Sequence, residues 1–409
     1  MQRIVKILVL VIMTDKMTNN PYILAEICED LLRPDIVNLL TLACKAVKML
    51  TYPEERFLSG KIKCPLRKAG KIEENNMKKF VTALILVCMM LSMAACGGSS
   101  EAEYKLGMGV VANTDSSSDN NAQVDATVAA VVTDANGKIV LCRLDCAQSK
   151  MDVTGGAVDT AKTFLTKREL RDDYNMVKYS NATLEWYQQA ENFEAYCVGK
   201  TADEIAGIET KVNDEGYNVA VDETLYASCS ISIEDFVAAV VKACNDEKGQ
   251  SFKASGELKL GLAAITNSAE STPATDTDPA AVKMYTEFGA AVVGADGKIL
   301  SAITDAIQPV INADKDGKIV DSSYKGTKRE LGADYGMVAY GNAIAEWDAQ
   351  AQAFANYTVG KTADEVRAIG TTQNDHGYSV AADETLYASC TMQITGMMAV
   401  LAQAADYAR

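Results

Sequence analysis

The segment Asp222-Glu-Thr-Leu-Tyr-Ala-Ser-Cys229 occurs a second time, unchanged, as Asp383-Glu-Thr-Leu-Tyr-Ala-Ser-Cys390. Another match, Thr166-Lys-Arg-Glu-Leu170 with Thr327-Lys-Arg-Glu-Leu331, has the same offset of 161 residues. Between residues 166 and 229 the two copies share 41 of 64 positions without a gap. So long a period, present only twice, indicates a tandem duplication of one domain and not a solenoid.

The duplication sets the expected domain organisation. We predict one repeat domain over residues 104–248 and a second over residues 256–409, with the boundary near residues 246–255 and a linker over residues 96–103. Upstream of the strongest match the offset falls to 160 at Asn136-Gly137 and Asp296-Gly297, and to 154 at Gly107 and Gly261. Such changes of register are expected in loops, because loops tolerate insertions.

The first half of each copy has the pattern of an antiparallel meander. Residues 106–112 and 258–265 predict the first strand of each copy, and polar loops follow at 114–121 and 271–279. Residues 124–133 alternate as a second strand, Asn136-Gly137 fits a tight hairpin turn, and residues 139–144 return as a third strand.

The second half of each copy predicts mainly helix. Trp186, Ala190, Phe193 and Cys197 recur at helical spacing, which is typical of a core-facing stripe. Residues 224–231 predict a last strand, and Ser232 is the expected N-cap of a final helix over residues 234–243. The fold class is therefore α+β: two tandem copies of an antiparallel sheet with helices packed on one face.

Two motifs that suggest a bound ion have simpler structural interpretations. Val198-Gly-Lys-Thr201 lacks the second glycine of a phosphate-binding loop, so we interpret Gly199 as a helix end and Thr201 with Glu204 as a capping box. Asp314-Lys-Asp-Gly317 begins like a calcium loop but has no glutamate at the last ligand position, which favours a plain turn. His376 is the only histidine, so neither a metal site nor a histidine-dependent catalytic triad is expected.

Two features remain as candidates for binding. The first is the basic pair of each copy, Lys167-Arg168 and Lys328-Arg329, which indicates either fixed ion pairs or contact with an anion. The second is the segment Leu-Tyr-Ala-Ser-Cys before the final helix. It is either a buried strand end or a place where free backbone amides accept a phosphate.

An export signal begins at an internal methionine. Met77-Lys-Lys is followed by an apolar run and by Ser92-Met-Ala-Ala-Cys96, the pattern of a lipoprotein signal peptide over residues 77–95. The run is shorter than the ~20 residues of a membrane span, which disfavours a transmembrane anchor. Cys96 is then the lipidation site, and the protein is expected at the cell membrane, lipid-anchored and facing outside the cytoplasm.

Residues 1–76 are expected to be an upstream extension from a start codon assigned too early. Glu73-Glu74 can be encoded by a purine-rich ribosome-binding sequence at a suitable distance from Met77. The extension holds 12 Lys and Arg and 9 Asp and Glu, so its net charge is positive. The chain from Cys96 onward holds 25 Lys and Arg and 46 Asp and Glu, so its net charge is strongly negative.

The strongly acidic exported part excludes some partners. Nucleic acid and anionic lipid headgroups need clusters of Lys and Arg, so neither is expected as a partner. Six cysteines lie beyond Cys96. The second copy has only Cys390, so disulfides within that copy cannot stabilise its fold. We favour free buried thiols and leave open a local disulfide between Cys142 and Cys146.

The order of elements resembles the small FMN-binding domain of membrane-linked bacterial electron-transfer proteins. That family ends in an Asp-x-x-Ser-Gly-Ala-Thr segment before an apolar helix, and its threonine can hold FMN through a phosphoester bond. Aligned on the final helix, Ser230 and Thr391 take the acceptor position, while Ser228 and Ser389 replace the glycine. The resemblance implies that Tyr226 or Tyr387 lies against the flavin ring and that the two basic pairs contact its phosphate.

The sequence predicts a lipid-anchored extracytoplasmic protein with twin domains that bind a small ligand or a surface protein. No catalytic set of residues is evident, so we expect no enzymatic activity and no obligatory cofactor. The alternative is an FMN-carrying electron-transfer lipoprotein with the flavin at Ser230 or Thr391.

Overall fold

The computed structural model describes residues 101–409, which belong to one compact unit that contains both copies of the repeat. The predicted extension (residues 1–76), signal peptide (residues 77–95) and lipidation site Cys96 lie outside the described residues. Within the described part of the chain, every helix is too short or too polar to cross a membrane.

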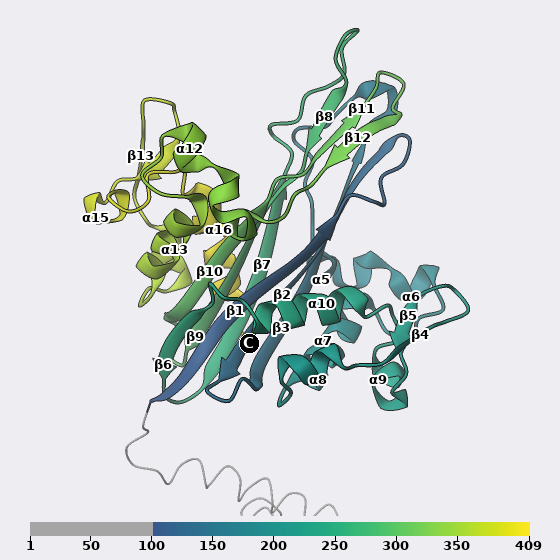
Figure 1. Cartoon of the computed structure of the whole chain (residues 1–409), viewed down its shortest axis with the longest axis vertical. Helices are drawn as coiled ribbons and strands as arrows, with labels where there is room; N and C mark the ends of the chain where they lie inside the picture. The colour runs from purple at the N-terminus through teal and green to yellow at the C-terminus, as the bar shows by residue number, and fades with distance from the viewer. Residues whose placement is uncertain (1–100) are drawn as a thin grey trace, which may run out of the picture. The chain divides into compact units, whose positions relative to one another are not determined.

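The first copy opens with a four-stranded antiparallel sheet in the order β3-β2-β1-β6 (Figure 1). Its strands are β1 (Ala102–Asn113), β2 (Asn121–Asp134), β3 (Ile139–Asp152) and β6 (Gln250–Ala254). Gly137 has a φ of 74° in the turn between β2 and β3, as predicted for Asn136-Gly137. The segment predicted as the domain boundary contains β6, which pairs with β1 at the edge of this sheet.

The second copy divides the same meander into two three-stranded sheets, β10-β9-β7 and β12-β11-β8. The strands are β7 (Leu258–Asn267), β8 (Ala280–Lys283), β9 (Tyr285–Gly294), β10 (Ile299–Ile307), β11 (Val310–Ala313) and β12 (Ile319–Ser323). The break between β10 and β11 falls at Pro309, which has no N–H to donate within a sheet. The residue at the same position of the first copy is Ser149, inside the continuous β3. Asp314 to Gly317 form the turn between β11 and β12, as predicted.

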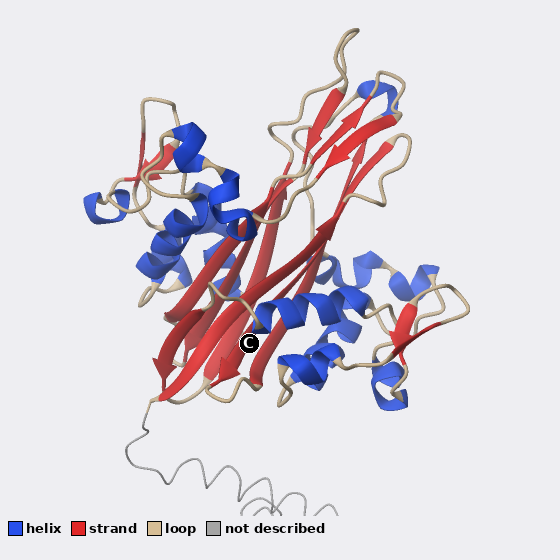
Figure 2. Ribbon diagram, viewed as in Figure 1, coloured by secondary structure: helices blue, strands red, loops and turns tan. Residues whose placement is uncertain are grey.

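Helices cover the outer face of the four-stranded sheet in the first copy and of the β10-β9-β7 sheet in the second. In the first copy they are α5 (Lys167–Leu170), α6 (Met176–Tyr179), α7 (Trp186–Cys197), α8 (Ala202–Ala206), α9 (Glu223–Ser228) and α10 (Glu234–Cys244), with the short 3-10 turns η1 (Thr154–Gly156) and η2 (Arg171–Tyr174) and the hairpin β4 (Thr210–Val212) with β5 (Asn218–Ala220). In the second copy they are α11 (Lys328–Leu331), α12 (Met337–Gly341), α13 (Trp347–Thr358), α14 (Ala363–Arg367), α15 (Glu384–Tyr387) and α16 (Thr395–Asp406), with η3 (Gly332–Tyr335) and the hairpin β13 (Thr371–Gln373) with β14 (Ser379–Ala381). The predicted α+β fold, an antiparallel sheet covered by helices in each copy, is confirmed (Figure 2).

The final helix of each copy packs directly on the first strand of its sheet. A Cβ on Gly107 would overlap the carbonyl oxygen of Ala243 in α10, and a Cβ on Gly261 would overlap that of Ala404 in α16. Glycine is therefore needed at both positions because the helix backbone touches the strand there.

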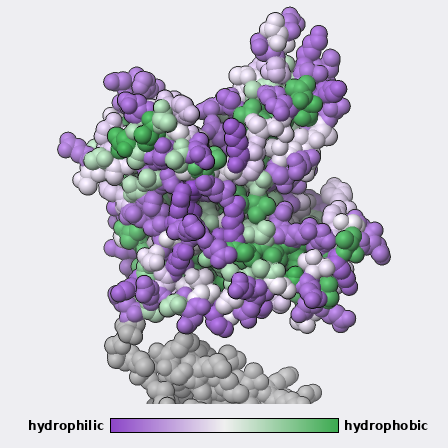
Figure 3. Space-filling view, in the orientation of Figure 1, coloured by the Kyte–Doolittle hydropathy of each residue, from purple (hydrophilic) through white to green (hydrophobic). Residues whose placement is uncertain are grey.

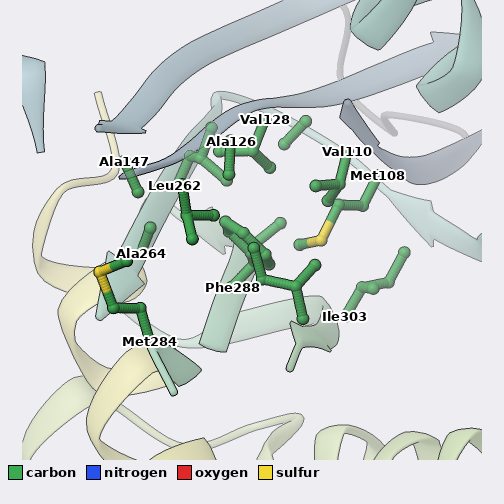
Figure 4. Close-up of a cluster of buried hydrophobic side chains, with 14 of the residues drawn as sticks. Met108, Val110, Ala126, Val128, Ala147, Leu262, Ala264, Met284, Phe288 and Ile303 are labelled. Carbon is green, nitrogen blue, oxygen red and sulfur yellow. The ribbon is translucent and has the colours of Figure 1, made fainter. Parts of the chain in front are cut away.

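The inner faces of the sheets of the two copies pack on each other and form one core shared by both copies. Alternate residues of β2, such as Val124 and Val128, point into this core, while Ala129 and Val131 point toward the helices of the first copy. Figure 4 shows Val128 and Met108 of the first copy in the same cluster as Phe288 of the second. The described chain thus has four layers: helices, sheet, sheet and helices. The surface in Figure 3 is mainly hydrophilic, in keeping with the acidic composition.

Two local predictions are wrong. Residues 224–231, predicted as a strand, form α9 and a loop, because the Asp222 side chain accepts the amides of Thr224 and Leu225 and starts a helix. In the second copy Asp383 starts α15 in the same way. The final helix begins at Glu234, as predicted, but its N-cap is Ile233, which makes no side-chain bond, and not Ser232.

The interpretation of Val198-Gly-Lys-Thr201 is correct. Gly199 has a φ of 85° after the end of α7, and Thr201 forms a capping box with Glu204 at the start of α8. Thr362 and Glu365 repeat this box in the second copy.

Candidate functional site

A pocket of about 580 Å³ opens on the outer side of the first copy. This volume lies in the range of small-molecule sites in proteins. Its wall combines the outer face of β2 and β3 with α5, α6, the start of α7, the β4–β5 hairpin, α9 and the start of α10. Of the candidate residues predicted from the sequence, the pocket brings together Lys167, Tyr226 and Ser230.

Lys167 enters the pocket from the first turn of α5. The capping box of Thr166 with Glu169 starts this short helix and so fixes where the lysine side chain emerges. The Lys167 ammonium lies 5.1 Å from the ring centre of Tyr174 and 5.6 Å from that of Trp186. Tyr174 is held by a hydrogen bond of 3.5 Å from its hydroxyl to Gln148 on β3. The site therefore presents a cation between two aromatic rings.

Arg168, predicted beside Lys167 as a site residue, is directed elsewhere. Its guanidinium pairs with Glu191 at 3.1 Å and with the buried Glu194, and its Nε donates to the carbonyl of Leu144. In the second copy Arg329 pairs with Asp246 at 3.0 Å, and both side chains are nearly buried, at 7% and 10% exposed. For the two arginines of the basic pairs, the structure thus shows fixed ion pairs.

The backbone of each basic pair is held by a buried carboxylate on the sheet. The amide of Arg168 donates to Asp145 on β3 at 3.2 Å, and that of Arg329 donates to Asp305 on β10 at 3.0 Å. Burial raises the pKa of each aspartate to about 6, and the neighbouring arginine opposes this rise. Each aspartate therefore anchors a helix start in the same way in the two copies.

Ser230 lines the pocket, but its polar groups already have partners. Its amide and its hydroxyl both approach Oε1 of the buried Gln189, at 2.8 and 3.3 Å, and the amide of Ile231 donates to the same oxygen. In the second copy Thr391 makes the same bonds to Gln350, at 2.9 and 3.2 Å. The free backbone amides that we considered from the sequence are therefore occupied in both copies.

The surroundings of Ser230 do not fit the phosphate of a flavin nucleotide. Glu234 and Asp235 lie in the first turn of α10, where their charge repels an anion, and Arg168 is engaged by two glutamates. Tyr226 and Tyr387 are exposed, at 40% and 41%. Tyr226 lies at the rim of the pocket, consistent with contact to a ligand but not specific for a flavin.

The second copy encloses its equivalent lysine. Lys328 is only 7% exposed, and its ammonium lies 4.6 Å from the ring centre of Tyr285, 4.8 Å from that of Tyr335 and 5.3 Å from that of Trp347. Burial lowers the pKa of Lys328 to about 8, although Glu287 on β9 opposes this shift. Burial raises the pKa of Glu287 to about 7, although Lys328 opposes that shift.

The carboxylates near the two lysines are not all carried by equivalent residues. In the first copy β2 carries Thr127 and α10 carries Asp235, and both line the pocket. In the second copy the strand carries Glu287, while the helix has Gly396 in place of the aspartate. A Cβ on Gly396 would overlap the Glu287 carboxylate. The helix therefore carries a carboxylate in the first copy and the strand carries one in the second, whereas the lysine keeps its position.

Sequence reasoning missed several residues of this site. Trp186 was interpreted only as core, but it is buried and also lines the pocket. Gln189 was not identified, although its recurrence as Gln350 inside an apolar helical stripe is the available signal for a buried polar bond. Lys167 was identified because the motif that contains it recurs.

The described residues show neither a metal site nor a disulfide. No group of three or more His, Cys, Asp or Glu lies close enough to hold an ion in residues 101–409. The six cysteines beyond Cys96 are free, including Cys142 and Cys146, and five of them are buried. Burial raises the pKa of the Cys146 thiol beside the pocket, so this cysteine is protonated at neutral pH.

No protein-family model matches this sequence, and neither a curated protein nor a solved structure matches it.

Proposed function

We propose that this protein is a lipid-anchored, extracytoplasmic binding protein whose first repeat holds a small ligand. The observation that carries the proposal is the pocket of about 580 Å³ in which Lys167 lies between two aromatic rings. Aromatic side chains, among them Tyr174 and Trp186, line the pocket together with polar groups, and such polar groups fix the orientation of a small ligand. The second repeat, with Lys328 enclosed, supports the fold through the shared core.

Catalysis is not part of this proposal. The polar groups that line the pocket include Ser230, whose hydroxyl bonds to the amide oxygen of Gln189 and not to a basic side chain. The thiol of Cys146 is buried and protonated. Neither residue is therefore arranged as an activated nucleophile.

The lipid anchor at Cys96 supports a location at the cell surface. Two acyl chains bury many methylene groups, at ~0.8 kcal/mol each, and this holds an acidic protein at a membrane without contact between its surface and the headgroups. The membrane is then a partner through the anchor, and the pocket of the first repeat is open to ligands outside the cell.

A thermal-shift screen of small metabolites tests the binding function. We expect compounds that raise the melting temperature of the wild-type protein but not that of Asp125→Tyr, which places the larger side chain of the second copy next to Gln148 in the pocket wall. A screen in which every active compound stabilises both proteins equally would refute a site in the first repeat.

The flavin-carrying alternative stays a prediction, and a spectrum tests it. A yellow protein from its native host, with added mass that disappears in Thr391→Ala or Ser230→Ala, would favour the electron carrier. A colourless protein without added mass on those residues would favour the binding protein.

A further inference from the structure

Lys167 has no direct ion pair in the described part of the chain, although the charge of Asp125 acts on it and Asp235 lines the same pocket. None of the ion pairs among residues 101–409 includes its ammonium, whereas Arg143, Arg168 and Arg409 all pair with Glu194. Its neighbours are the rings of Tyr174 and Trp186, and it faces the pocket. A cation that is held in a pocket without a direct ion pair favours a ligand with a negative group at that point.

The second copy shows which groups surround the equivalent lysine when the chain itself supplies them. Tyr285 extends from β9 so that its ring lies over Lys328 and its hydroxyl oxygen lies 3.4 Å from the ammonium. Glu287, two residues along the same strand, adds a carboxylate whose charge acts on Lys328. Lys328 is thus surrounded by three rings and has an oxygen acceptor, all from its own chain.

The first copy lacks the third ring. Asp125 holds the position of Tyr285 there. Its carboxylate accepts hydrogen bonds from the side-chain amides of Gln123 and Gln148, at 2.7 and 2.9 Å. The position of Glu287 is held by Thr127. The smaller side chains of Asp125 and Thr127 therefore leave room for a ligand beside Lys167, although the charge of Asp125 also acts on this lysine.

The rim of the pocket limits the charge of that ligand. Asp214, Glu215 and Asp235 are exposed and line the same pocket, so Lys167 faces three carboxylates at the entrance. Like charges disfavour a ligand with several negative groups, such as a phosphate ester. A single carboxylate that contacts Lys167 away from the rim meets less of this repulsion.

We propose that the pocket of the first copy binds a small aromatic monocarboxylate. Its carboxylate pairs with Lys167, and its ring takes the place that Tyr285 takes in the second copy. This inference rests on the proposed binding function and names the chemical class of the ligand.

Calorimetric titration of the full-length protein with 3-phenylpropionate tests the inference, with 2-phenylethylamine and inorganic phosphate as matched probes. We expect saturable binding of 3-phenylpropionate only, because the amine shares the ring but not the carboxylate. Lys167→Met keeps the length of the side chain and removes its charge, and should weaken binding by about 30-fold or more. Lys328→Met, the same change in the second copy, should leave the affinity unchanged.

Asp125→Tyr provides a second test that does not depend on Lys167. It puts a ring of the chain where the ligand ring should lie, so it should abolish binding of 3-phenylpropionate. Failure of 3-phenylpropionate to bind the wild-type protein, or equal affinity for wild type and Lys167→Met, would overturn the assignment. If other compounds from the thermal-shift screen still bind the first repeat, the binding function stands and only the ligand class is wrong. If nothing binds, both fail.

Discussion

Glu287 and Gly396 are a matched pair: the carboxylate of Glu287 on β9 occupies the space that any side chain at position 396 on α16 would need. The corresponding residues of the first copy, Thr127 and Asp235, have the small and the acidic residue exchanged between strand and helix. A carboxylate thus approaches the lysine from the helix in the first copy and from the strand in the second.

Gly396→Asp should destabilise the second copy because it forces two carboxylates into one space. We expect a loss of about 2 kcal/mol in the free energy of unfolding, measured by guanidinium denaturation. The double variant Gly396→Asp with Glu287→Thr reproduces the first copy and should recover most of that loss. Additive effects of the two changes would show that the pair is not coupled.

Stability should fall as the pH rises from about 4.5 to about 7, through the titration of Glu287. Burial raises its pKa to about 7 in the folded state, so the folded chain binds a proton that the unfolded chain has already released in this window. Glu287→Gln cannot titrate and should flatten this part of the profile, whereas the exposed Glu234→Gln should leave it unchanged. Asp145 and Asp305, with pKa values of about 6, act in the same direction and keep some slope in the variant. A profile that is the same in wild type and Glu287→Gln would contradict this account.

Arg329→Met should cost about 3 kcal/mol, because it leaves the nearly buried carboxylate of Asp246 without its partner. Arg367 forms more exposed pairs with Asp364 and Asp406, so Arg367→Met should cost less than about 1 kcal/mol. Chemical denaturation of both variants measures the difference. Similar costs for the two changes would show that burial does not set the strength of these pairs.

Cys96→Ala should prevent lipid attachment. We expect an unprocessed precursor or release of the chain from the anchor, seen by membrane fractionation and intact mass. Ser99→Ala, close to the same site, is the control and should leave processing intact. Normal membrane retention of a correctly cleaved Cys96→Ala protein would refute the anchor.

Features that depend on neighbouring residues could be predicted from the sequence. The turn at Gly137, the end of α7 at Gly199 and the capping boxes at Thr201 and Thr362 follow from local backbone rules, and the structure has them. The error at residues 224–231 has the same local origin, because the β-rich composition outweighed the helix start at Asp222.

Features that depend on contacts distant in the sequence could not be predicted in this way. The alternation of β2 shows two buried faces but not that the inner face meets the sheet of the other copy. The repeat identified Lys167 and Lys328 as equivalent, but only the fold shows that Tyr285 encloses one and that Asp125 leaves the other open. The bonds of Gln189 to Ser230 join residues 41 positions apart and likewise depend on the fold.

The stoichiometry of ligand binding, measured by titration calorimetry, tests most directly whether the first repeat alone holds a ligand. We predict one site per chain in the wild-type protein and none in Asp125→Tyr, for any compound that passes the thermal-shift screen. Two equal sites per chain, or unchanged binding by Asp125→Tyr, would contradict a single open pocket beside Lys167.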